Sequence, residues 1–352
     1  MVRKQQQSRV IQTIIAILLV AGTIATTIAP QVNAQSSEVT LTLAGYAVPR
    51  EAYAEIIPLF QAYWEKEKGQ KVTFQESYIA SGAQSRAVVG GFEADVVALS
   101  IESDVTRIAD AKLITKDWKG NAYKGFVTDS VAVITVRKDN PKAVKDWADI
   151  AKEGVEVITP DPATSGGAQW NLLAAYGAAK RGQVEGVEKG EEPALEFLGK
   201  VIANVSVFDK DGRESFLTFE RGIGDAAITY ENEAYAGLDA GGEFEVIYPA
   251  STILIENPVA VVDVYAEKHG TLEVANAFVN FLYSPDAQAV FAKKGFRPVV
   301  ADVLKDEAFT GKFPEIKDLF TIAEFDGWGA VRKNLFGEEG KITKLIADIK
   351  GK

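Results

Sequence analysis

The amino-acid sequence predicts an α/β protein of two lobes, each built on a mostly parallel sheet flanked by helices. Three observations lead to this fold class. Short runs rich in β-branched and aromatic residues alternate with longer segments of helical periodicity, which is typical of parallel sheets. The chain has 352 residues and 47% hydrophobic residues, enough for two lobes with a large buried core and a cleft between them. It has no cysteine, so no disulfide framework holds it together.

Residues 1–34 have the three-part pattern of a secretory signal peptide. Three basic residues precede an apolar segment over 10–28, and Val32-Asn33-Ala34 forms a cleavage site of the small-x-small type. A membrane anchor is the alternative, because the apolar segment approaches the length of a bilayer span, but glycine and threonine residues interrupt it. We expect cleavage after Ala34 and export to the periplasm. Without a lipid-bearing cysteine, the mature protein should diffuse freely there.

The charge of the expected mature chain excludes one class of partner. Removing three basic residues with the leader leaves 35 basic against 49 acidic residues, a net charge of −14. Such a charge opposes attraction to nucleic acid or to an anionic membrane. A small molecule and a protein partner remain as candidates.

The elements alternate along the whole expected mature chain. Strands are predicted over 39–45, 71–77, 95–100, 130–137, 155–159, 226–230 and 244–248. Helices are predicted over 51–66, 83–89, 169–180, 194–202 and 215–220, and the last ~90 residues are again helical. In the first helix, Tyr53, Ile56, Ile57, Phe60 and Trp64 form an apolar stripe that we expect in the core, while Pro58 predicts a kink or a late start.

The expected lobes are discontinuous in sequence. Lobe I comprises 35–132 and 260–352, and lobe II comprises 133–259, with crossovers near 131–137 and 259–264. Only the alternation of elements is read directly from the residues, and the crossovers are inferred from it.

Few residues could support catalysis or hold a metal. The single histidine, His269, lies in a polar stretch and is expected in a solvated loop or at a helix start. One histidine is too few for a zinc site with several histidine ligands, and its polar surroundings do not favour a role in a catalytic triad. A carboxylate pair remains possible, but no calcium loop, phosphate-transfer loop or hydrolase elbow occurs. We predict no catalytic residue, no metal and no cofactor.

Small or hydroxyl residues stand at three expected helix starts, where backbone N–H groups lack partners. The segment Pro160 to Trp170 has Ser165 as a candidate cap and places Gly166 and Gly167 in the first turn, at about 1 kcal/mol each relative to alanine. An anion close to the backbone would compensate this cost. The other entries are Ile79 to Gln84 and Tyr46 to Glu51, with Pro49 suited to the first helical position. Ordinary caps and a plain glycine-rich turn are the alternatives at all three.

At these residues the sequence resembles the sulfate- and thiosulfate-binding components of ABC-type importers, over essentially all of the mature chain. The stretches that carry the resemblance are Ala94-Asp95-Val96-Val97, Val157 to Asn171, Glu220 to Asp225, Glu231-Asn232-Glu233 and Leu282-Tyr283-Ser284-Pro285. The resemblance implies a periplasmic-binding-protein fold whose two lobes close by hinge motion around a dehydrated sulfate. It also implies a monomeric receptor that delivers its ligand to the membrane permease of an ABC importer.

The resemblance also implies the ligand-binding residues. The hydroxyl and amide of the first lobe fall on Ser81, the Ser-Gly-Gly helix entry falls on Ser165, Gly166 and Gly167, and a further amide falls near Gly212. Two positions depart from the family. Ala47 replaces an aspartate whose amide serves the ligand, and Tyr230 replaces a tryptophan whose indole N–H donates to it; these changes give thiosulfate more weight.

Hydrogen-bond chemistry predicts the selectivity of such a site. A pocket of donors alone leaves the proton of a protonated phosphate facing another donor, which costs about 1 to 3 kcal/mol, whereas sulfate carries no proton at neutral pH. Molybdate is rejected only through its size. The alternatives are therefore a molybdate or phosphate receptor, a secreted hydrolase or transferase that uses a carboxylate pair, and an adhesion or scaffold protein that binds no small solute.

Overall fold

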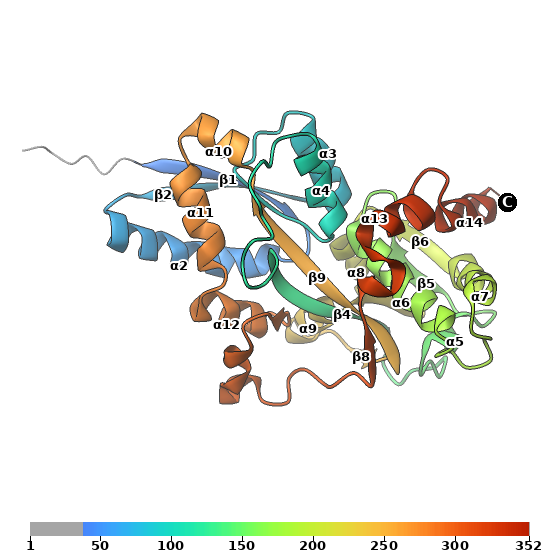
Figure 1. The fold of residues 1–352 in the computed structure, drawn as a ribbon. Helices are drawn as coiled ribbons and strands as arrows, with labels where there is room; N and C mark the ends of the chain where they lie inside the picture. The colour runs from blue at the N-terminus through green and yellow to red at the C-terminus, as the bar shows by residue number, and fades with distance from the viewer. Residues whose placement is uncertain (1–37, 352) are drawn as a thin grey trace, which may run out of the picture. The chain divides into compact units, whose positions relative to one another are not determined.

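The strands of the protein form one mixed system of pairings. A computed structural model describes residues 38–351, so the predicted signal peptide lies outside the described residues. The central strand order is β2-β1-β3-β9-β4-β7-β5-β6 (Figure 1). The strand bounds are β1 Val39–Tyr46, β2 Val72–Ile79, β3 Val96–Ala98, β4 Phe126–Arg137, β5 Val157–Pro160, β6 Val205–Asp209, β7 Ala226–Tyr230, β8 Phe244–Ile247, β9 Ser251–Val261, β10 Arg297–Pro298 and β11 Asp318–Phe320.

Two groups of parallel strands are separated by two long antiparallel ones. Strand β1 pairs in parallel with β2 and β3, and β5 pairs in parallel with β6 and β7. Between the groups, β4 and β9 pair antiparallel with each other, β9 pairs antiparallel with β3, and β4 with β7. The predicted α/β class is confirmed, and outside the two groups the short β11 pairs in parallel with β9. All seven predicted strands are present.

Strands β6, β9, β10 and β11 were not predicted. Within β9, Glu256, Asn257 and Pro258 interrupt the apolar run that would signal a strand. The strand forms because neighbours pair with it on both sides and its other residues are mostly buried. Tertiary pairing therefore overrides the local sequence signal at this position.

Helices lie between the strands along the chain (Figure 1). Their bounds are α2 Arg50–Lys68, α3 Ser81–Val89, α4 Glu102–Asp110, α5 Trp147–Ile150, α6 Gly166–Lys180, α7 Glu191–Ala203, α8 Gly212–Glu220, α9 Glu231–Asp239, α10 Asp263–His269, α11 Leu272–Phe281, α12 Pro285–Lys293, α13 Gly327–Val331 and α14 Lys341–Lys350. The five individually predicted helices are confirmed, as is the helical C-terminal region. Helix α2 begins at Arg50 and continues through Pro58, so the late start predicted from this proline is wrong, and Pro49 precedes the first helical position.

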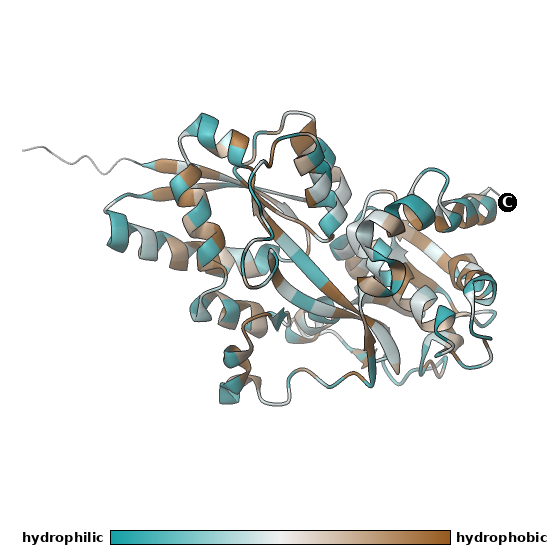
Figure 2. Ribbon diagram, in the orientation of Figure 1, coloured by the Kyte–Doolittle hydropathy of each residue, from teal (hydrophilic) through white to brown (hydrophobic). Residues whose placement is uncertain are grey.

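The apolar stripe of α2 lies in the core, as predicted. Tyr53, Ile56, Ile57, Phe60 and Trp64 are all buried. The ring of Phe60 packs 5.0 Å from that of Phe278 on α11, and the ring of Tyr53 lies 5.8 Å from that of Phe291 on α12. Colouring by hydropathy shows brown and teal alternating along α2 (Figure 2), which is the pattern of a helix with one face buried.

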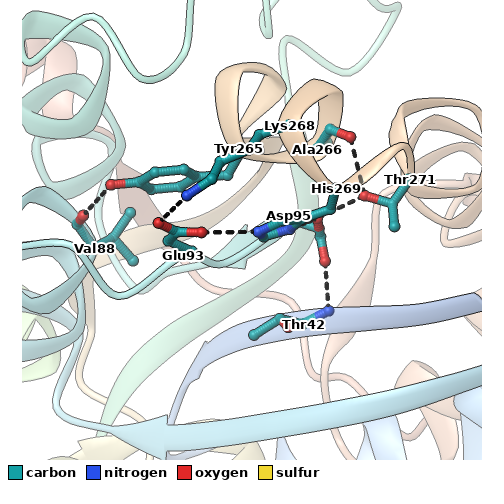
Figure 3. A network of polar contacts seen from close by, with 9 residues as sticks. All are labelled: Thr42, Val88, Glu93, Asp95, Tyr265, Ala266, Lys268, His269 and Thr271. Atoms are coloured by element: carbon teal, nitrogen blue, oxygen red, sulfur yellow. Dashed lines mark hydrogen bonds and ion pairs between the residues drawn. The ribbon is translucent and has the colours of Figure 1, made fainter.

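His269 is part of a polar network at the exposed end of a helix, so its solvated position is as expected, but it does not lie in a loop or at a helix start. It is the last residue of α10, its side chain is 28% exposed, and its Nδ1 lies 2.8 Å from Asp95 Oδ1 (Figure 3). Asp95 also accepts hydrogen bonds from Thr42 N and Thr271 Oγ1 at 2.7 and 2.6 Å. The buried Asp95 therefore joins β1, the start of β3 and the end of α10.

The C-terminal segment lies against helices from the middle of the sequence. Arg181, which follows α6, donates to Asp318 Oδ1 at 2.6 Å, and Lys341 forms an ion pair with Glu191 at the start of α7. A Cβ added at Gly177 would meet the ring of Phe320 at 2.5 Å, so a glycine is needed where this segment approaches α6. Across residues 38–351, no helix is long and apolar enough to cross a membrane.

Candidate functional site

Six of the seven predicted ligand residues line one small cavity. They come from the entries to α2, α3, α6 and α8 and from the end of β7. The complete lining is Tyr46, Ala47, Val48, Ala80, Ser81, Ser100, Pro160, Ser165, Gly167, Asn171, Asp211, Gly212, Thr229, Tyr230 and Glu233. The helix entries therefore converge in space, which the sequence alone could not establish.

The remaining predicted residue, Gly166, lies behind the cavity wall. A Cβ built on it would stand 3.1 Å from the side chains of Ile101 and Ser100. The neighbouring Gly167 has more room, because its Cβ would lie 3.4 Å from Ser165 Oγ and 3.6 Å from the ring of Tyr230. The two glycines thus differ: the first is required by packing, whereas the second brings the backbone to the cavity.

The cavity is sized for one small ligand. Its volume is about 20 Å³, and one water molecule needs roughly 10–15 Å³. A sugar or a peptide would not fit without movement of the surrounding helix entries.

Backbone N–H groups supply the donors of this cavity. Within residues 38–351, no protein atom accepts a hydrogen bond from the amides of Ala47, Ser81, Gly167 or Gly212. Ser81, Gly167 and Gly212 belong to first helical turns, where intrahelical acceptors do not exist. Because the positive ends of the helix dipoles lie at the same places, the cavity is suited to an anion.

The entry to α6 has the predicted cap. Ser165 is the N-cap residue, and its Oγ accepts a hydrogen bond from Ala168 N at 3.3 Å. Its own amide donates to Asp161 O at 2.8 Å, so the Ser165 hydroxyl, rather than its N–H, is the group left to serve a ligand. The serine therefore both caps the helix and lines the cavity.

Ser81 does not cap α3, so the capping alternative is wrong there. Its Oγ donates to Asp104 Oδ2 at 2.6 Å and accepts from Ser100 N at 3.0 Å. The next residue, Gly82, donates its amide to Thr164 O at 3.1 Å, and a Cβ on it would lie 2.9 Å from that oxygen. Glycine at 82 thus allows the entries of α3 and α6 to touch.

Tyr230 ends β7, and its hydroxyl already has a protein partner. The Tyr230 hydroxyl oxygen lies 2.7 Å from Ser100 Oγ, and either atom could donate. The side chain is 3% exposed, and burial raises the pKa of its hydroxyl. To donate to a ligand, the Tyr230 hydroxyl would have to accept from Ser100 Oγ or give up this hydrogen bond.

Two functional candidates were not predicted as site residues. The hydroxyl of Tyr46 is buried in the cavity wall without a hydrogen-bond partner, and burial raises its pKa well above the ordinary value. Glu233 is 1% exposed, and neither of its carboxylate oxygens accepts a hydrogen bond. Burial is also the main cause that raises the pKa of Glu233 to about 7.

The charges of the wall are acidic or absent. Among the lining residues there is no lysine, arginine or histidine, whereas Asp211 and Glu233 are present. Asp211 Oδ1 caps α8 by accepting from Glu214 N at 2.9 Å. Glu233 is different, since it brings an acceptor into a site predicted to contain only donors. Among residues 38–351, no cluster of three or more histidine, aspartate or glutamate side chains could hold a metal ion.

The fold and the cavity define a class of protein, a binding protein that holds a small anion among helix entries. The chain belongs to the family described as bacterial extracellular solute-binding protein, whose model matches residues 41–297.

Its relatives include the sulfate-binding protein of Synechococcus elongatus, which is 42% identical over 95% of this chain and 96% of that protein. The thiosulfate-binding protein of Escherichia coli is 38% identical over 95% of each chain. Among solved structures, the sulfate-binding protein SubI from Mycobacterium tuberculosis aligns with a TM-score of 0.77 and 40% identity, covering 85% of this chain and all of that one.

Proposed function

We propose that this protein is an extracytoplasmic receptor that captures sulfate or thiosulfate and delivers it to the permease of an ABC importer. The observation that carries the proposal is the convergence of partnerless amides from Ala47, Ser81, Gly167 and Gly212 on one cavity without a lining cation. Relatives named for sulfate and thiosulfate binding match nearly the full chain. These relatives do not favour the alternatives, which are a molybdate receptor, a phosphate receptor and a hydrolase.

The chemistry of the cavity suits a fully ionised tetrahedral anion. Backbone dipoles stabilise negative charge without the cost of desolvating a lysine or arginine. A hydrogen phosphate ion would place its proton against one of these donors unless Glu233 accepted it. A preference for sulfate over phosphate therefore requires that the Glu233 carboxylate does not contact the ligand.

The two-lobe division remains part of the proposal. Strands β4 and β9 connect the parallel group of β1 to that of β5, which supports crossovers near 131–137 and 259–264. The contacts of Asp318 with Arg181, and of Lys341 with Glu191, favour assigning the C-terminal segment to lobe II instead of lobe I. In this division the chain crosses three times, and closure of the two lobes encloses the ligand.

We also propose that the mature protein begins at Gln35, is periplasmic and monomeric, and has no enzymatic activity. Calorimetric titration of residues 35–352, freed of bound anion, tests the receptor function. Sulfate should bind with micromolar or better affinity, about −8 kcal/mol, thiosulfate should compete for the same site, and phosphate and molybdate should give no heat. Absence of binding to all four anions would overturn the proposed function.

A further inference from the structure

An acidic side chain stands in the wall of a cavity built for an anion. Both carboxylate oxygens of Glu233 lack a hydrogen bond, and the side chain is 1% exposed. Water therefore does not screen it, and a dianion in the cavity would meet a second negative charge at short range. Either Glu233 must be neutralised or the anion must bind weakly.

One cation lies within reach of Glu233. Arg213 Nη2 forms an ion pair with Glu233 Oε1 at 3.1 Å, and this contact is not a hydrogen bond. The same nitrogen donates to Glu51 Oε2 at 2.8 Å and approaches the carbonyl oxygen of Val48 at 3.4 Å. Arg213 therefore contacts two carboxylates and one carbonyl while standing outside the cavity lining itself.

The position of Arg213 in the chain ties these contacts to the anion site. It follows Gly212 in the first turn of α8, whereas Val48 and Glu51 follow Ala47 at the entry to α2. The amides of Gly212 and Ala47 are two of the cavity's partnerless donors. A side chain that connects α8 to α2 at this point fixes the separation of those donors.

We propose that Arg213 is a positioning residue of the anion site, which neutralises Glu233 at the cavity wall and clamps the entry of α8 to that of α2. This inference rests on the proposed oxyanion binding and adds to it the residue that makes an acidic wall compatible with a dianion. It also explains how the amide of Ala47 is held in place without the acidic side chain that the family often carries at this position.

The remaining charges around Glu233 do not replace Arg213. On α8, Asp211 and Glu220 face it with negative charge, as does Glu51 on α2, while Tyr46 at the end of β1 and Tyr230 at the end of β7 are near enough to interact with it. Among the described groups with the largest effects on the pKa of Glu233, Arg213 is the one that lowers it. Without Arg213, the carboxyl of Glu233 is therefore charged only at a more alkaline pH and becomes neutral as the pH falls.

The test compares sulfate binding by the wild type and by Arg213→Gln at pH 6 and pH 9.5. The variant should lose roughly tenfold or more in affinity at pH 9.5, mainly through faster dissociation, because a buried charge is left without its partner. Its affinity should recover substantially at pH 6, with a larger ratio between the two pH values than in the wild type. The double variant Arg213→Gln/Glu233→Gln should show a much smaller ratio, and Arg213→Lys should keep part of the affinity.

A matched control is Lys210→Gln, which removes an exposed ion pair with Glu214 two residues before α8. It should bind sulfate as the wild type does, and thermal melting of each variant checks that it is folded. If the wild type binds sulfate and Arg213→Gln binds it equally at both pH values, the inference is overturned. If the wild type itself binds no sulfate, the proposed function fails first.

Discussion

Replacing Gly167 by proline removes one backbone donor from the cavity while leaving its neighbours in place. Gly167 is preferable to Gly166 for this experiment, because any side chain at 166 would also press on Ile101 and Ser100 at 3.1 Å. At 167, an added Cβ would meet its nearest neighbour at 3.4 Å. Proline is tolerated in a first helical turn because no intrahelical acceptor is lost there.

The expected loss follows from the charge of the acceptor. A hydrogen bond to a charged group contributes about 1.5–3 kcal/mol, so sulfate affinity should fall roughly 10- to 150-fold in Gly167→Pro. Proline also restricts the backbone of the residue before it, Gly166, so we expect a loss of affinity near the upper end of this range. Calorimetric titration at one pH measures the change directly.

Gly167→Ala is the matched control, because it adds a methyl group of similar position and keeps the N–H. Its affinity should stay within about threefold of the wild type, which is under 1 kcal/mol, and its melting temperature should not fall. If Gly167→Pro is folded and binds sulfate as tightly as Gly167→Ala, the amide at 167 does not contribute to the site and the reasoning is refuted.

Three further predictions concern single side chains. Tyr46→Phe removes a buried hydroxyl that has no protein partner, so it should leave the anion-free protein as stable as before and weaken sulfate binding; unchanged affinity by calorimetry would exclude a ligand contact. Ser165→Ala should lower the free energy of unfolding by ~1 kcal/mol through the lost cap and also weaken binding, whereas urea unfolding that shows no loss would contradict the capping role. Hydrogen bonds of the His269 ring to the carboxylates of Glu93 and Asp95 raise the pKa of His269 (Figure 3). Its stabilisation is thus complete below the unfolded pKa of about 6.5 and is lost as the pH rises through the folded value. His269→Gln should flatten this dependence in urea unfolding, and an unchanged slope would contradict it.

Local sequence signals were sufficient for much of the fold and for the helix entries. A capping serine followed by two glycines identified the start of α6, because capping and first-turn geometry depend on adjacent residues. The strands of the parallel groups, apart from β6, were found for the same reason, since β-rich runs mark them locally. The interrupted β9 was missed because its pairing partners are distant in sequence.

The charges and hydroxyls of the cavity wall required the structure. Tyr46 and Glu233 became candidates only because packing leaves their polar atoms buried without partners, a property that no local pattern reveals. The pairing of Arg213 with Glu51 and Glu233 joins three helices and was invisible for the same reason. The Glu231-Asn232-Glu233 stretch was noted as a resemblance, but its chemistry depended on where α9 lies.

The central claim is that backbone amides from separate helix entries bind the anion together. Titration of ¹⁵N-labelled mature protein with sulfate, followed by amide NMR, tests it most directly. We predict that the amide signals of Ala47, Ser81, Gly167 and Gly212 shift together and reach saturation at one equivalent of sulfate. Saturable binding of sulfate that leaves these four signals unmoved would contradict the account.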